Sequence, residues 1–313
     1  MIASKQVDTL AVRIVLSEHG DALFYAETDP YEESPGLLLK QKLFAWHEPS
    51  FYGTELEIRK VGEVEAVLLP SEEVIPFLAD GRRLEHVEWI WKDEAETLLR
   101  LAPLLAECLE GGKYVPDLAA YRAGRLRWIW DPDALEEPRR AELEGSGMEE
   151  AVLEGLRAAF SAAVFHRRYG TEEAAADLRR EFPLLFAKGE AAVQASAGLD
   201  ARSWLVRIGW KTDTAPFRPV LQLLEPWEGM EFPRWRLKLV LQDKRDAATV
   251  YKVRLASDGE ARGKWPSEWA AQVGERSRGW LEQLRACLPA SRFAGGDDVL
   301  AGTLGDEDAW RFL

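Results

Sequence analysis

The spacing of apolar residues changes near residue 197, and this change constrains the fold more than any other feature. Before it, apolar residues recur every three to four positions, as helices require, most clearly in residues 147–169. After it, apolar and polar residues alternate, as in half-buried strands. The alternating runs are SWLVRIGWK (203–211), FRPVLQLLE (217–225), RWRLKLVLQ (234–242) and TVYKVRLA (249–256). This pattern predicts helices, including 147–169 and a second from Thr171 toward Phe186, packed on a four-stranded antiparallel sheet.

The first half of the chain mixes strands and helices. Residues 9–27 predict a β-hairpin, VEAVLLP leads into a short helix that Ser71 is expected to cap, and residues 93–110 predict a helix that ends at two glycines. The fold class is therefore α+β, with an N-terminal mixed β/α domain followed by a helical and antiparallel-sheet domain. The run EEPRRAELEGSG (136–147) is predicted to be a linker or a long loop, and we place the domain boundary there. We expect domains at residues 1–140 and 147–313.

Composition narrows the class of protein. The 313 residues include 40 Lys and Arg against 54 Asp and Glu, which gives a net charge of −14. A surface that binds phosphate must therefore be confined to one part of the protein. The two cysteines, Cys108 and Cys287, form no CxxC pair, which favours a reducing compartment. No run of about 18 apolar residues occurs, and we expect a cytoplasmic protein with no membrane contact.

The sequence specifies no catalytic or metal site. A P-loop needs GxxxxGK[ST], and that motif is absent. His47-Glu48 begins like a zinc-binding HExxH motif, but Phe51 stands where the second histidine belongs. Ser146 lies between glycines in an expected loop and not in a nucleophile elbow. We therefore expect no enzyme activity, cofactor or metal in this chain.

Charge segregation gives the candidate site. Residues 201–264 hold 13 basic and 8 acidic side chains, while the first 200 residues hold 22 and 38. Side chains alternate across a strand, so the basic residues of the predicted strands should share one face, which could contact a nucleic-acid backbone. The alternative is the solvated face of a half-buried sheet. The candidates are Arg207, Lys211, Arg234, Arg236, Lys238, Lys252 and Arg254, with Trp227 as a stacking candidate.

Three segments carry a resemblance to a known family. The strand and turn pattern FRPVLQLLEPWEG with WRLKLVLQDKRDAATVY, residues 217–251, resembles the helicase-associated region of bacterial Swi2/Snf2-type DNA helicases and translocases. The segment LFAWHEPSFYGTELE (43–57) is similar to the N-terminal part of such proteins. DEDAWRFL (306–313) looks like the start of a helix in the same associated domain.

The resemblance implies a longer protein in which two RecA-like motor lobes follow this region and use ATP and Mg²⁺. No motor residue carries over to this chain. Because its last residues look like a helix that has barely begun, we expect the chain to be a fragment or a truncated gene product. Its expected role is that of a non-catalytic accessory region that contacts DNA or positions the motor lobes of the same longer chain. The alternative is an acidic protein-interaction or regulatory module that binds a basic protein and makes no DNA contact. A free-standing enzyme ranks third.

Overall fold

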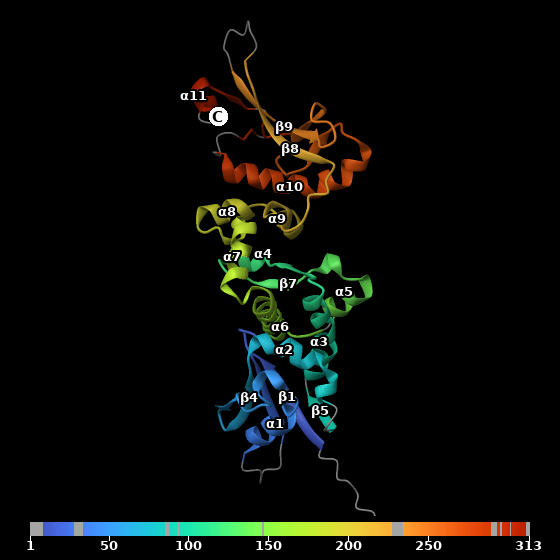
Figure 1. The fold of residues 1–313 in the computed structure, drawn as a ribbon. Coiled ribbons are helices and arrows are strands. Elements are labelled where there is room, and N and C mark those ends of the chain that lie inside the picture. Colours follow the sequence, from blue (N-terminus) through green and yellow to red (C-terminus); the bar gives the residue numbers. More distant parts are fainter. Residues whose placement is uncertain are drawn as a thin grey trace, which may run out of the picture. The chain divides into compact units, whose positions relative to one another are not determined.

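The computed structural model describes residues 9–27, 34–84, 88–92, 94–145, 147–226, 234–288, 293–294, 296–300 and 302–310. The chain divides into two compact units, Met1–Glu181 and Phe182–Leu313, which are described separately below. Figure 1 shows the elements of both units. Within the described ranges, no helix combines the length and the apolar character that crossing a membrane requires.

The first unit is built on a five-stranded sheet of order β3-β4-β2-β1-β5. Its strands are β1 (Thr9–Leu16), β2 (Ala22–Glu27), β3 (Glu57–Val61), β4 (Val64–Leu69) and β5 (Glu88–Lys92). The β1–β2 pair is the hairpin expected from residues 9–27. Strand β5 pairs with β1 in parallel, so the sheet is mixed. A separate two-stranded sheet joins β6 (Tyr114–Pro116) to β7 (Trp128–Trp130).

Helices complete the core of the first unit. The helix predicted at Ser71 and the helix predicted to end at glycine are both present, as α2 and α3. Ser71 is the first residue of α2 and not its cap, because Pro70 occupies the N-cap position. Apolar side chains on α3, among them Leu98, Leu101 and Leu105, are buried. The helices are α1 (Pro35–Leu43), α2 (Ser71–Ala79), α3 (Ala95–Glu110), α4 (Leu118–Arg122), α5 (Glu137–Glu144), α6 (Glu150–Val164) and α7 (Glu172–Glu181).

The second unit is an antiparallel sheet with a long helix on one face. The sheet runs β11-β10-β9, with β8 on the other edge of β9 and the short β12 pairing the start of β9. The sheet packs through Phe217, Leu241 and Leu255. Their partners are Trp269, just before α10, and Trp280, within α10. The strands are β8 (Phe217–Leu224), β9 (Trp235–Asp243), β10 (Val250–Leu255), β11 (Ala261–Gly263) and β12 (Thr303–Leu304). The helices are α8 (Glu190–Ser196), α9 (Ala201–Arg207), α10 (Ala270–Cys287) and α11 (Asp306–Trp310).

The α+β class and the four-stranded antiparallel sheet, β8 to β11, are confirmed. The first of the four predicted strands is wrong, because 203–211 contains most of helix α9 and the turn after it. The Asp200 carboxylate caps this helix by accepting a hydrogen bond from the Ser203 N–H at 2.7 Å. Trp204, Leu205 and Ile208 are buried at helical spacing, so the buried stripe has period 3.6 and not 2. The fourth strand is β11.

The helices that cover the sheet also differ from the expectation. The helix predicted from 147–169 is α6, continued by a π-helical turn (Phe165–Tyr169), and it packs on α2 in the first unit. Gly155 lies directly against Leu16 and Ser17 of the β1–β2 hairpin. In the described chain α10 covers the sheet instead. Residues 136–147, expected as a linker, contain helix α5, whose Glu142 pairs with Arg100 of α3 at 2.6 Å. The compact units therefore differ from the expected 1–140 and 147–313 division by the segment 147–181.

Candidate nucleic-acid interface

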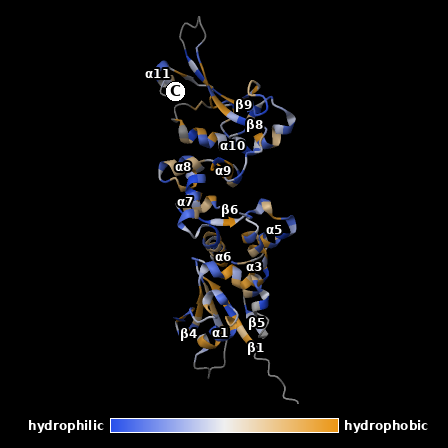
Figure 2. Cartoon of the chain, in the orientation of Figure 1, coloured by the Kyte–Doolittle hydropathy of each residue, from blue (hydrophilic) through white to orange (hydrophobic). Residues whose placement is uncertain are grey.

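The register of the second sheet decides which side chains share a face. Paired residues on neighbouring strands point the same way, and residues two apart on one strand do too. Lys252 pairs with Val240, and Arg218 pairs with Gln242, so these four side chains lie on the face that also carries Arg236 and Lys238 of β9. Arg254 pairs with Arg262. The opposite face holds the apolar residues that pack on α10. Figure 2 shows the hydrophilic and hydrophobic residues of β9 and α10 interleaved along each element.

One face of this sheet therefore gathers cations from four strands, and we call it the cationic sheet face. All of its cationic side chains are exposed except the half-buried Lys238. Its members are Arg218 on β8, Arg236 and Lys238 on β9, Lys252 and Arg254 on β10, and Arg262 on β11. Adjacent strands lie about 4.8 Å apart. Several cations thus lie close enough together to follow a line of phosphates.

The cations of this face differ in their partners. Arg262 is neutralised locally, because its guanidinium lies 2.9 Å from Glu260 Oε2 and 2.8 Å from Asp297 Oδ1. Arg218 donates a hydrogen bond to the Gln242 side-chain oxygen at 2.6 Å. No described residue forms an ion pair with the remaining four, which are Arg236, Lys238, Lys252 and Arg254. These four cations are available to an anion from solution.

The same face carries no aromatic ring among the described strand residues. Its uncharged positions are aliphatic or polar, and they are Val220, Gln222, Leu224, Val240, Gln242, Val250 and Thr303. Stacking on bases needs an exposed ring, whereas phosphate contacts need only placed cations. The chemistry of this face therefore fits a nucleic-acid backbone and not its bases.

Three of the seven predicted basic residues are not members of this face. Arg207 is the last residue of helix α9, and Lys211 follows in the bend after it, because the run that holds them is not a strand. Arg234 is exposed but precedes the first residue of β9. Trp227, the stacking candidate, lies outside the described residues.

The sequence prediction missed Arg218 and Arg262. Arg218 lies in a run whose prediction as a strand is correct, but alternation within one strand cannot say which side faces the core. The pairing of Arg218 with Gln242 supplies that information. Arg262 belongs to a three-residue strand that is too short to show a period, and its pairing with Arg254 reveals its face.

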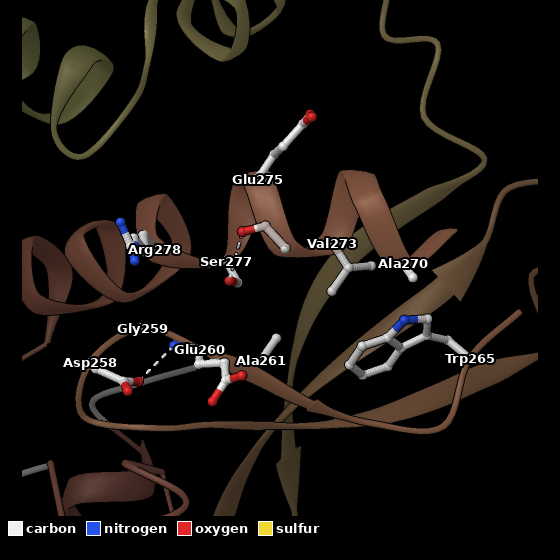
Figure 3. Close-up of a pocket in the computed structure, with 11 residues that line it drawn as sticks. Asp258, Gly259, Glu260, Ala261, Trp265, Ala270, Val273, Glu275, Ser277 and Arg278 are labelled. Atoms are coloured by element: carbon white, nitrogen blue, oxygen red, sulfur yellow. Dashed lines mark hydrogen bonds between the residues drawn. The ribbon is translucent and has the colours of Figure 1, made fainter. Parts of the chain in front are cut away.

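A cleft of about 610 Å³ lies in the second unit between helix α10 and the turn that joins β10 to β11 (Figure 3). The Asp258 carboxylate accepts a hydrogen bond from the Glu260 N–H at 2.9 Å and so shapes the turn. In Figure 3 the side chain of Glu275 points away from this turn. The wall thus carries the carboxylates of Asp258 and Glu260 against the single cation of Arg278, a balance that does not fit phosphate. In the described part of the chain, no group of three His, Cys, Asp or Glu side chains could hold a metal ion.

The two units also differ in their net charge. Residues 1–181 hold 21 basic and 36 acidic side chains, whereas residues 182–313 hold 19 and 18. The excess negative charge of the protein therefore belongs to the first unit. The cationic sheet face lies in a unit whose own net charge is close to zero, so a polyanion meets little general repulsion there.

The fold and this face define an α+β protein with a phosphate-compatible surface on its second sheet. Comparison with curated proteins finds a similar protein from Bacillus subtilis (strain 168), named "Putative ATP-dependent helicase/translocase YwqA". The two are 26% identical over 306 residues, which cover 97% of this chain and 29% of that protein. The chain thus spans less than a third of its relative's length. This similarity supports a helicase-related family. No protein-family model and no solved structure matches the chain.

Proposed function

We propose that this chain is a non-catalytic accessory region of a bacterial, cytoplasmic Swi2/Snf2-like DNA translocase. Its second unit contacts the DNA backbone through the cationic sheet face. Motor lobes in the same longer protein supply ATP hydrolysis, and they are its partners. The observation that carries the proposal is the set of four cations, Arg236, Lys238, Lys252 and Arg254, that have no carboxylate partner among the described residues.

Two facts support DNA as the ligand of this face. The Bacillus subtilis relative is named as a helicase/translocase, and the alignment covers nearly all of this chain. The face also lacks aromatic rings on its described strands, which fits contacts that do not depend on base sequence. Binding through phosphates alone releases counterions, so affinity should fall steeply as salt is added.

The test is a salt titration of DNA binding by the whole chain. The variant Lys238→Ala, Lys252→Ala and Arg254→Ala removes three neighbouring cations that have no ion-pair partner among described residues. Fluorescence anisotropy with a labelled 20-base-pair duplex is recorded from about 20 to 300 mM KCl. We expect the slope of log K against log salt to become shallower by about 0.9 for each phosphate that the variant no longer neutralises. Stability should change by only about 0.5 kcal/mol for each of the exposed residues Lys252 and Arg254, and circular dichroism checks that the variant with the half-buried Lys238 replaced is folded.

The control variant is Lys60→Ala, Lys188→Ala and Arg202→Ala, which changes net charge equally at exposed positions that are not members of the face. This control should bind like the unchanged protein. If both variants bind with the same slope, or if the unchanged protein does not bind duplex at 20 mM KCl, the face is only a solvated sheet surface. The acidic protein-interaction module is then the better description.

A further inference from the structure

A turn in the first unit exposes three large aromatic side chains. Trp46, Phe51 and Tyr52 keep 61%, 66% and 52% of their surface accessible, and we call residues 46–53 the aromatic turn. The rings of Phe51 and Tyr52 lie 6.1 Å apart. Such rings are normally buried because each covers a large apolar area. Exposed apolar groups gathered at one place mark an interaction surface.

The backbone of this turn is strained at the same residues. Phe51 and Tyr52 have φ values of 49° and 58°, the left-handed region, which costs about 1–2 kcal/mol per residue that is not glycine. The Phe51 N–H donates to the Glu48 carbonyl at 2.8 Å, and the Tyr52 N–H donates to the His47 carbonyl at 2.9 Å. Strain of this kind persists where the surroundings impose it, and it concentrates at functional sites.

A buried cluster imposes the conformation. His47 is 1% exposed, and its Nδ1 lies 2.7 Å from the Ser50 hydroxyl. That hydroxyl also accepts a hydrogen bond from the Gly53 N–H at 3.0 Å, which closes the turn. The imidazole packs edge-on against Phe77, and its Nε2 lies 3.4 Å from a carboxylate oxygen of Glu73. Because Ser50 is buried and already bonded, this cluster is a support for the turn and not a nucleophile.

The charges around the turn select the partner. Glu48 and Glu55 are exposed within or beside it. The nearby Lys40 ammonium is held by the carbonyls of Thr54 and Leu56 at 2.9 and 2.7 Å. The unit as a whole has 15 more acidic than basic residues. This environment repels phosphates and attracts cations, and exposed rings add a cation–π contact to Lys or Arg.

We propose that the aromatic turn docks a basic polypeptide segment in which Lys or Arg side chains alternate with aliphatic ones. The aliphatic side chains cover Phe51 and Tyr52, and the cations meet Glu48, Glu55 and the ring faces. This site lies in the first unit, so it is separate from the cationic sheet face of the second. Because the turn already holds one fixed backbone conformation, it loses little conformational entropy on binding.

The test measures binding of two labelled peptides to the whole chain by fluorescence anisotropy at 100 mM salt. One 12-residue peptide alternates Arg and Leu, and the other alternates Glu and Leu. We expect the Arg peptide to bind and the Glu peptide not to bind. The variant Trp46→Ser, Phe51→Ser should weaken the Arg peptide at least about tenfold, as removal of aromatic anchors does. The variant Glu48→Gln, Glu55→Gln should weaken it less and reduce its salt dependence.

The matched control is Val61→Ser, Val64→Ser, because both valines are 48% exposed at the β3–β4 turn. Circular dichroism checks that every variant is folded. The proposal fails if the variant Trp46→Ser, Phe51→Ser binds the Arg peptide as the unchanged protein does. It fails too if the unchanged protein does not bind the Arg peptide. It also fails if the variant Trp46→Ser, Phe51→Ser keeps the Arg peptide but loses binding of a single-stranded 20-nucleotide DNA, which would make the turn a base-stacking surface. Dissociation of a dimer by the same variant in sedimentation would overturn it too, because a second copy would then be the occupant.

Discussion

Gly20, in the β1–β2 turn, shows how one residue fixes the packing of a helix. Its φ is +90°, and an added Cβ would lie 2.7 Å from the Ala159 Cα of helix α6. We expect Gly20→Ala to lower the free energy of unfolding by about 3 kcal/mol, because backbone strain and overpacking add. Urea denaturation followed by circular dichroism measures this.

Gly62 provides the control for backbone strain alone. Its φ is +66°, but an added Cβ would meet no atom within 4 Å. We expect Gly62→Ala to cost only about 1 kcal/mol. Equal decreases for the two variants would mean that α6 does not press on the β1–β2 turn, and the close approach of Gly20 to Ala159 would then be contradicted.

At the scale of elements, Asp213 ties together the segments around the second sheet. Its carboxylate accepts hydrogen bonds from Lys244 after β9 at 2.8 Å and from the Ala215 N–H at 3.1 Å, and it lies 3.3 Å from Arg276 of α10. Burial alone would raise the pKa of Asp213, but these hydrogen bonds outweigh it and hold the pKa below its ordinary value.

This shift predicts the pH dependence of the second unit. An unfolded Asp has a pKa near 3.9, and the folded value is lower, so the stabilisation is present above that pH and lost as the pH falls through the folded value. We expect Asp213→Asn to cost about 1 kcal/mol at pH 7, with the difference from the unchanged protein shrinking toward pH 3. Urea titrations at both pH values measure it. Glu275→Gln, at an exposed helix position, is the control, and a difference that persists at pH 3 would contradict the assignment.

For the whole molecule, the two compact units predict where the chain can be divided. We expect residues 1–181 and 182–313, expressed separately, each to unfold cooperatively in urea. Residues 1–146 should not unfold cooperatively, because this piece lacks α6, whose Leu156, Phe160 and Val164 are buried. Cooperative unfolding of 1–146 alone would favour the division that the sequence predicted, residues 1–140 and 147–313.

The sequence by itself determined the features that depend on neighbours along the chain. Alternation gave strands β8, β9 and β10 and the shared face of Arg236 with Lys238, while the passage from strand to helix at Ser71 and the glycine signals predicted α2 and the end of α3. Tertiary structure decided the features that depend on distant partners. The run 203–211 fits both periods, and the burial of Trp204, Leu205 and Ile208 together made it a helix. The contact of α6 with α2 and the addition of Arg218 and Arg262 to the cationic sheet face rest on packing and register, because a local pattern specifies which face is apolar but not what covers it.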